Sequence, residues 1–351
     1  MPGLRLSVLD QSPVTAGSTS ADALHRSVDL ARLADATGYT RYWAAEHHGT
    51  AMLACASPEA LIGPIAMTTN RIRVGSGGVM LPHYSPLKVA ETFTMLSGLF
   101  PNRIDLGLGR AAGTDPVTAY ALQRDRRQPA ADDFPQQLAE LLAYLNDTLP
   151  AGHRFARLAA LPGSPARPAP WLLGSSPQSG IWAAETGLPY AFADFINPGG
   201  GAIARRYRET FQPSAMHPAP HVIVATWALC AETDAEAQRQ AASARMAFTL
   251  FLQGQPGPVP PVDAAVAFLE THVEAISAFA RQRRWTVGTP PVVRERLEAL
   301  AEEYGADEVM VVTITHEHAA RRRSYELLAD AFGLADGTTA GTTPRAQPST
   351  A

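Results

Sequence analysis

The most chemically capable group in the chain is the tripeptide Glu46-His47-His48, which directly follows a run expected to form a strand at 39–45. Histidine and glutamate can ligate a metal, but successive residues of an extended chain point to opposite faces, and no HExxH spacing supplies further ligands. We therefore predict no metal site. Two interpretations stay open: an imidazole works as a general acid or base, or one histidine packs at the rim and only hydrogen-bonds Glu46.

A second group of polar residues lies where a predicted strand at 171–173 leads into a predicted helix at 177–186. Free backbone N–H groups and the positive end of the helix dipole converge at such a point, which favours a bound phosphate. Helix capping by Ser176 explains the same pattern equally well. The residues of this loop that could contact a phosphate are Gly174, Ser175, Ser176 and Ser179.

Arg110 follows the predicted strand at 103–107 and could bind the same phosphate through two parallel hydrogen bonds. The alternative is a rim ion pair with a carboxylate such as Asp105 or Asp115. A glycine-rich segment, Gly75-Ser76-Gly77-Gly78, follows the predicted strand at 71–75 and would let backbone approach a ligand closely. Together these features predict a phosphorylated cofactor or substrate.

The elements that must position these residues alternate between short apolar runs and longer helical patterns. Strict alternation predicts a parallel sheet, and eight strand–helix units favour its closure into a (β/α)8 TIM barrel of the α/β class. An open doubly wound sheet is the alternative. The predicted strands span 4–9, 39–45, 71–75, 103–107, 171–173, 189–192, 221–230 and 308–313, and the helices 20–37, from 58, 86–99, 134–149, 177–186, 200–211, 234–251 and 316–332.

The 351 residues carry a net charge of −4, only two cysteines and no long apolar run, and we expect no signal peptide. We expect a cytoplasmic protein with no nucleic-acid or membrane partner. One barrel domain should span residues 1–335, with an inserted lid at about 252–265 before the eighth strand, where prolines and glycines exclude regular structure. Residues 336–351 read as a disordered tail.

Several motifs, in order along residues 4–333, resemble the bacterial luciferase-like flavin monooxygenase family. The matching runs are YWAAEHHG (42–49), IRVGSGGVMLPHYSPLKVAETF (72–93), PNRIDLGLGRAAGTD (101–115), WLLGSSPQS (171–179), VGTPPVVRERLEAL (287–300) and GADEVMVV (305–312). The resemblance implies a usually homodimeric barrel that receives reduced FMN from a separate NAD(P)H-dependent reductase. The flavin then reacts with dioxygen, and a flavin peroxide oxidises a small organic substrate.

The resemblance also implies roles for individual residues. His47, with its neighbour Glu46, matches the catalytic position. Ser76, Gly77 and Gly78 match a segment with a non-proline cis peptide against the isoalloxazine ring. The residues that match the phosphate-binding positions are Arg110, Gly174, Ser175, Ser176 and Ser179.

Two positions depart from the family pattern. Asn102 stands where the family commonly has glycine, and asparagine tolerates the left-handed conformation that the turn needs. Gly113 stands near a flavin-contacting aromatic of luciferase itself, so the resemblance does not support light emission.

The resulting prediction is an FMN-dependent monooxygenase. The alternatives are a deazaflavin-dependent dehydrogenase of the same fold, a non-catalytic flavin-binding protein and a metal-dependent hydrolase. Neither the lid nor the loop at 111–130 identifies the substrate.

Overall fold

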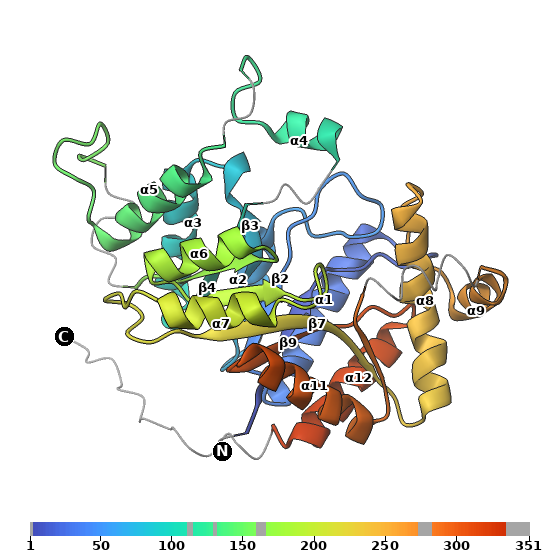
Figure 1. Cartoon of the computed structure of the whole chain (residues 1–351). Coiled ribbons are helices and arrows are strands. Elements are labelled where there is room, and N and C mark those ends of the chain that lie inside the picture. The colour runs from blue at the N-terminus through green and yellow to red at the C-terminus, as the bar shows by residue number, and fades with distance from the viewer. Residues whose placement is uncertain (1–2, 111–114, 129–131, 159–165, 273–282, 335–351) are drawn as a thin grey trace, which may run out of the picture.

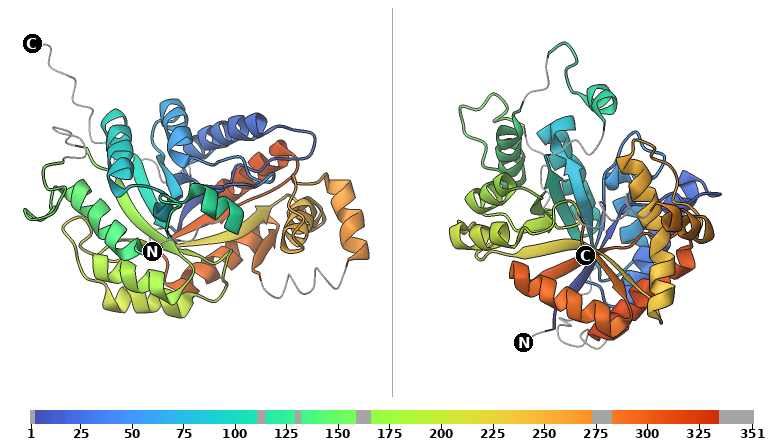
Figure 2. Two further views of the ribbon diagram at one scale, coloured as in Figure 1. Left: turned by 90° about the horizontal axis from the view of Figure 1, so that it is seen from above. Right: turned by 45° about the vertical axis from the view of Figure 1, so that its right-hand side comes forward.

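The computed structural model describes residues 3–110, 115–128, 132–158, 166–272 and 283–334, which form a parallel barrel surrounded by helices (Figures 1 and 2). Eight strands follow one another around the ring, which closes because β6 pairs with β7 and β9 returns to β1. The predicted (β/α)8 fold is confirmed, and the open sheet is excluded. The ring consists of β1 (Arg5–Asp10), β2 (Arg41–Ala44), β3 (Arg73–Met80), β4 (Ile104–Gly109), β5 (Ala169–Gly174), β6 (Tyr190–Ala193), β7 (Val222–Cys230) and β9 (Glu308–Val312).

The helices begin where the sequence supplies caps. Thr19 and Asp22 form a capping box before α1, and Pro58 occupies the first turn of α2. The helices are α1 (Ser20–Ala36), α2 (Pro58–Thr68), α3 (Pro86–Leu99), α4 (Pro116–Leu122), α5 (Phe134–Asn146), α6 (Pro177–Thr186), α7 (Gly201–Thr210), α8 (Asp234–Leu252), α9 (Val262–Thr271), α11 (Pro290–Tyr304) and α12 (His318–Phe332), with a short 3-10 turn η1 (Leu81–His83). No helix in the described part of the chain is long and apolar enough to cross a membrane.

One strand, β8 (Trp285–Gly288), is absent from the sequence prediction. It pairs only with the second half of β7, from Trp227 onward. Trp227 also pairs with Val312 of β9, so β8 lies on the other edge of β7, beyond the end of β6. The barrel wall is therefore extended at the carboxyl end of β7.

The third strand is longer than predicted, because β3 runs on to Met80 instead of ending at residue 75. Its register with β4 shifts by one residue between Ser76 and Val79, which is a β-bulge. The glycines carry no side chains, so they hide the period-two pattern that would have marked the strand. The peptide bond Gly77–Gly78 within the bulge is cis, which confirms one expectation drawn from the resemblance.

The predicted lid comprises the end of α8, a connecting segment and the start of α9. Val259 of this segment is fully buried, and its backbone exchanges hydrogen bonds with Val14 and Ala16. The segment is thus anchored to the loop after β1, and its role as a lid stays a prediction. Asn102 adopts the expected left-handed conformation with φ of 62°. Gly113 and the predicted tail at 336–351 lie outside the described residues.

The side chains inside the barrel change in kind from its amino end to its carboxyl end. Charged groups come first, with Arg41 of β2 held between carboxylates of two other strands. Trp43 and Trp171 come next, with ring centroids 5.4 Å apart. Small residues follow near the carboxyl end: Gly77, Ala191, Ala193 and Ala225. Because these residues cannot fill the barrel, a cavity opens at its mouth.

The charged layer at the amino end is a buried ion cluster. Arg41 donates from Nη1 to Asp105 Oδ2 (2.8 Å) and from Nε to Glu308 Oε2 (3.2 Å). Burial alone would raise the pKa of Glu308, but the Arg41 charge, the nearby His221 and a hydrogen bond from Ser7 lower it to about 2. An unfolded glutamate titrates near ~4.3. The cluster therefore stabilises the fold above that pH, and this stabilisation is lost as the pH falls toward 2.

We expect Arg41→Met to lower the free energy of unfolding at pH 7 by about 3–5 kcal/mol, because it leaves the buried Glu308 without its arginine, while Asp105 keeps its pair with Arg73. The loss should shrink as the pH drops below about 4.5, where Glu308 of the variant takes up a proton. Urea denaturation followed by circular dichroism at pH 7 and pH 4 measures both effects. Arg127→Gln, which breaks an exposed pair with Asp125, is the control and should change little. Equal stability of Arg41→Met and the parent at pH 7 would show that the cluster contributes nothing.

Candidate active site

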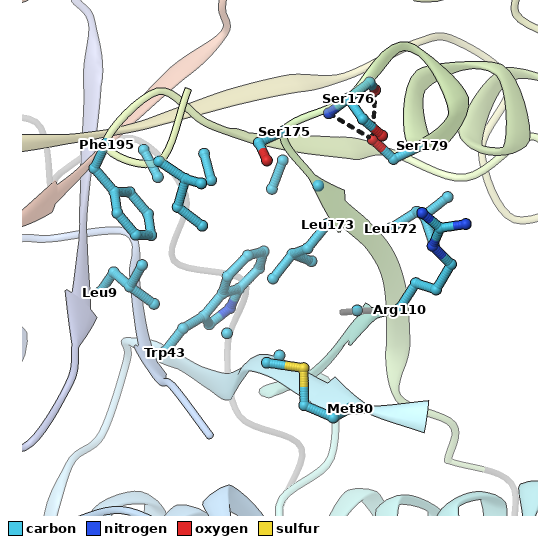
Figure 3. A pocket seen from close by; sticks show the side chains of 18 of the residues that line it. Leu9, Trp43, Met80, Arg110, Leu172, Leu173, Ser175, Ser176, Ser179 and Phe195 are labelled. Atoms are coloured by element: carbon cyan, nitrogen blue, oxygen red, sulfur yellow. Dashed lines mark hydrogen bonds between the residues drawn. The ribbon is translucent and has the colours of Figure 1, made fainter. Parts of the chain in front are cut away.

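Two neighbouring cavities open at the carboxyl end of the barrel. The first, drawn in Figure 3, is lined by the ends of β3, β4 and β5 and by the start of α6. Seven of the ten predicted site residues line it, so the structure brings together segments that are far apart in the sequence. These seven are Gly77, Gly78, Arg110, Gly174, Ser175, Ser176 and Ser179.

Gly77 and Gly78 form a part of the wall where no side chain would fit. A Cβ atom at Gly78 would lie 2.7 Å from the carbonyl oxygen of Gly107, and one at Gly77 would overlap side chains inside the barrel. Ser76, the third predicted residue of this segment, is fully buried and does not line the cavity. Its hydroxyl donates to the Gly107 carbonyl oxygen (2.9 Å), so it links β3 to β4.

The serine hydroxyl groups in the loop between β5 and α6 have two different environments. Ser176 and Ser179 form a capping box, and the Ser179 hydroxyl also lies 2.9 Å from that of Tyr190. The pair thus contributes to the helix start, and its role in binding a phosphate stays a prediction. The Ser175 hydroxyl has no hydrogen-bond partner among the described residues, and Figure 3 shows it directed into the cavity. It can donate to a ligand beside the unsatisfied N–H groups of the first turn of α6.

Arg110 lies at the other side of this cavity, directly after β4. Its side chain is exposed, its guanidinium carbon is 5.4 Å from the centroid of the Trp182 ring, and Figure 3 shows it turned toward the start of α6. Neither of the rim ion pairs forms: Asp105 pairs with Arg41, and Asp115 accepts hydrogen bonds at the start of α4. The guanidinium thus has no carboxylate partner in the described part of the chain and is available to an anion.

The second cavity, of about 480 Å³, adjoins the first. The side chains of Phe195 and Ile196, from the loop after β6, line both. His47 lines the second cavity, together with Gln11 from the end of β1. Its volume is within the range of sites for small organic molecules.

His47 is held in a largely apolar environment. Its backbone N–H donates to the Cys55 carbonyl oxygen (2.9 Å), which fixes the loop after β2. Burial, with a smaller contribution from the nearby His48, lowers the pKa of His47 to about 4. Its Nδ1 atom and the Gln11 Oε1 atom are buried without a hydrogen-bond partner among the described residues. The imidazole is therefore neutral near pH 7 and can accept a proton or a hydrogen bond.

Glu46 lines neither cavity, although the sequence analysis paired it with His47 as catalytic. One carboxylate oxygen accepts from His48 Nε2 (2.7 Å) and the Tyr84 hydroxyl (2.9 Å), and the other from the Met80 N–H (3.0 Å). The glutamate thus ties the loop after β2 to the end of β3. The interpretation in which a histidine merely hydrogen-bonds Glu46 describes His48. No group of three or more metal-ligating side chains occurs in the described ranges.

Sequence reasoning missed the apolar residues of both cavities. Trp43 and Leu9 line the first cavity, and Trp227 and Phe248 line the second. The strand positions could have been found by extending the alternation from Arg41 to Trp43 and by placing every second residue of a barrel strand inside. Phe248 lies near the C-terminal end of α8, outside the strands, so this alternation could not have found it.

These features define an α/β-barrel protein with a serine-rich helix start beside an unpaired arginine and a histidine-lined cavity at the carboxyl end of its strands. The profile of the luciferase-like monooxygenase family matches residues 4–308. The chain belongs to this family, as the motifs in the sequence indicate.

Similar proteins cover nearly the whole chain. The uncharacterised protein YwcH of Bacillus subtilis is 47% identical over 93% of this chain and 98% of its own length. The N-acetyl-S-alkylcysteine monooxygenase of the same organism is 37% identical over 93% of this chain and 98% of its own. Among solved structures, apo-MsnO8 is 43% identical, covers 98% of this chain and 99% of its own, and superimposes with a TM-score of 0.88.

We expect His47 to titrate near pH 4 in the free protein, because its burial disfavours the imidazolium form. Nuclear magnetic resonance of ¹⁵N-histidine-labelled protein measures this, and the spectrum of His47→Gln identifies the signal. A midpoint above pH 6 would contradict the apolar environment described here.

Proposed function

We propose that this protein is an FMN-dependent monooxygenase, which uses reduced flavin and dioxygen to oxidise a small organic substrate. The observation that carries this proposal is the shared wall between the two cavities. Phe195 and Ile196 separate a cavity with anion donors from a cavity with a neutral histidine whose Nδ1 has no hydrogen-bond partner among the described residues. Such an arrangement suits a phosphorylated cofactor beside a small substrate.

The residues of the first cavity fit FMN. The start of α6, the Ser175 hydroxyl and the Arg110 guanidinium would hold its phosphate. Gly77 and Gly78 leave a face without side chains, on which a flat ring system could lie. Reduced FMN bound there would supply the electrons that activate dioxygen for transfer of one oxygen atom to the substrate.

The residues of the second cavity would orient the substrate and manage a proton. His47, with its lowered pKa, would accept a proton or a hydrogen bond at its imidazole ring. Glu46 is a positioning residue in this scheme, because it acts through His48 and the loop that carries His47. The aromatic side chains of Phe195, Trp227 and Phe248 would exclude water from the reacting groups.

The proposal also covers the source of the reduced flavin and the oligomeric state of the protein. A separate NAD(P)H-dependent reductase would provide the reduced flavin, as the family resemblance implies. Met67, Met95 and Leu99 are exposed on the contacting helices α2 and α3, and this apolar surface favours the homodimer. The relative named N-acetyl-S-alkylcysteine monooxygenase supports oxygenation of a small organic compound.

We expect Arg110→Gln to weaken FMN binding about tenfold or more, because hydrogen bonds to charged groups each contribute about 1.5–3 kcal/mol. Riboflavin has the same ring without the phosphate, so its affinity should stay within about twofold. Flavin fluorescence titration of the parent, Arg110→Gln and the surface control Arg127→Gln measures both affinities. An equal loss for FMN and riboflavin, or no preference of the parent for FMN, would refute the phosphate site.

The reaction itself is tested with FMN, an NAD(P)H-dependent flavin reductase and ¹⁸O₂, with N-acetyl-S-methylcysteine and other small thioethers as substrates. We expect one ¹⁸O atom in the product, and a rate lowered about 10²-fold or more in His47→Gln with FMN affinity unchanged. A large loss of FMN affinity in this variant would instead assign His47 a structural role. Reduction of a deazaflavin by an alcohol, without oxygen consumption, would favour the dehydrogenase alternative.

A further inference from the structure

The second cavity has a strongly aromatic wall. Trp227 lines the cavity and stacks at 14° on Trp285, which does not line it, with ring centroids 5.3 Å apart. Phe248 meets Trp227 edge to face at 4.9 Å, and Phe195 meets it at 5.9 Å. Such a wall accommodates an apolar or aromatic part of a ligand and binds it through area burial and ring contacts.

One cation, Arg283, also lines this cavity. It lies two residues before β8, the strand that extends the barrel wall. Its Nη1 donates to the backbone carbonyl oxygens of Phe195 and Ile196, the latter at 2.7 Å, so the guanidinium is fastened to the wall between the cavities. Its Nε and Nη2 atoms have no partner among the described residues, and they remain free to bind a carboxylate.

The neighbouring arginine, Arg284, differs from Arg283 because carboxylates neutralise its charge. Arg284 forms ion pairs with Asp194 (3.3 Å) and Glu303 (3.0 Å), which anchor the start of β8. Arg283 has no carboxylate partner in the described part of the chain. Its burial lowers the pKa of the guanidinium, which shows that the charge is partly removed from water without compensation.

Among the described residues, no ion pair joins Arg283 to Asp115, the carboxylate that also lines the cavity. Asp115 accepts hydrogen bonds from the backbone of Val117 and Thr118 and from the Thr118 hydroxyl at the start of α4. His48 is bound to Glu46. Arg283 is therefore a cation without a carboxylate partner among the described residues that line the second cavity.

We propose that the second cavity binds an organic anion, a carboxylate with an apolar or aromatic tail, with the carboxylate on Arg283 and the tail against Trp227, Phe248 and Phe195. The role of this anion as the substrate rests on the proposed function. Arg283 is then a specificity-determining residue, because a neutral ligand of the same shape leaves its charge unpaired.

Three probes of equal length test this proposal without flavin: 4-phenylbutanoate, 4-phenylbutan-1-ol and 4-phenylbutan-1-amine. Their dissociation constants for the flavin-free protein are measured by isothermal titration calorimetry. We expect the carboxylate to bind at least about tenfold more tightly than the alcohol, and the amine to bind most weakly, because hydrogen bonds to a charged group are the stronger ones. Phe248→Ala should weaken the acid and the alcohol alike.

Arg283→Gln should abolish the preference for the carboxylate while leaving the alcohol affinity within about twofold, and Arg283→Lys should restore part of it. The surface variant Arg127→Gln should change none of the three affinities. Equal binding of acid and alcohol by the parent, or equal loss of both in Arg283→Gln, would overturn the proposal.

FMN affinity is measured separately on the same variants. A loss of FMN binding in Arg283→Gln with unchanged probe affinities would assign the arginine to the cofactor and overturn the proposal. Selective binding of the carboxylate by a protein that does not bind FMN would sustain the anion site and refute the monooxygenase. The two proposals therefore fail in distinguishable ways.

Discussion

The contact between Arg41 and its two carboxylates determines how the inside of this barrel is filled. The Arg41 side chain lies between β4 and β9. Ion pairs and hydrogen bonds therefore connect the strands across the amino end of the barrel. Trp43 then donates to the same carboxylate of Asp105 (2.9 Å) and packs against Trp171. Because the amino end of the barrel is filled by these packed side chains, the carboxyl end can carry small residues. These residues leave a cavity there without exposing the core to water.

The glycines of β3 and β4 also separate the packed part of the barrel from the cavity at its carboxyl end. Gly75 and Gly107 have no room for a Cβ atom because the backbones of the two strands approach closely, with Ser76 bound to Gly107 between them. The one-residue bulge above this contact redirects the end of β3 toward the mouth. At the end of β3, the Met80 N–H donates to the Glu46 carboxylate. The bulge therefore leaves the cavity wall without side chains and also holds the loop that carries His47.

The sequence predicts this architecture well wherever a side-chain pattern marks it. The bounds of α3 and α6 agree with prediction because a proline begins each helix and an apolar face runs through it. The prediction was wrong where the pattern is missing. The predicted third strand ended too early because the glycines of β3 carry no side chains that would mark the alternation. The strand β8 was not predicted because four residues are too few to show a period-two pattern. Arg283 could not be found from the sequence for the same reason, since only the pairing of β8 with β7 brings it to the site.

The two cavities use arginine in different ways, and the difference follows from burial. Arg110 is exposed beside Trp182, where water already compensates its charge, so a phosphate there gains mainly from two-point geometry and from the helix start. Arg283 is half-buried and held by backbone carbonyls, which satisfy hydrogen-bond donors but cannot neutralise a charge. The wall of Phe195 and Ile196 separates the two guanidinium groups, so each can select its own anion. If both proposals hold, such a site would distinguish cofactor from substrate by where each negative charge is bound.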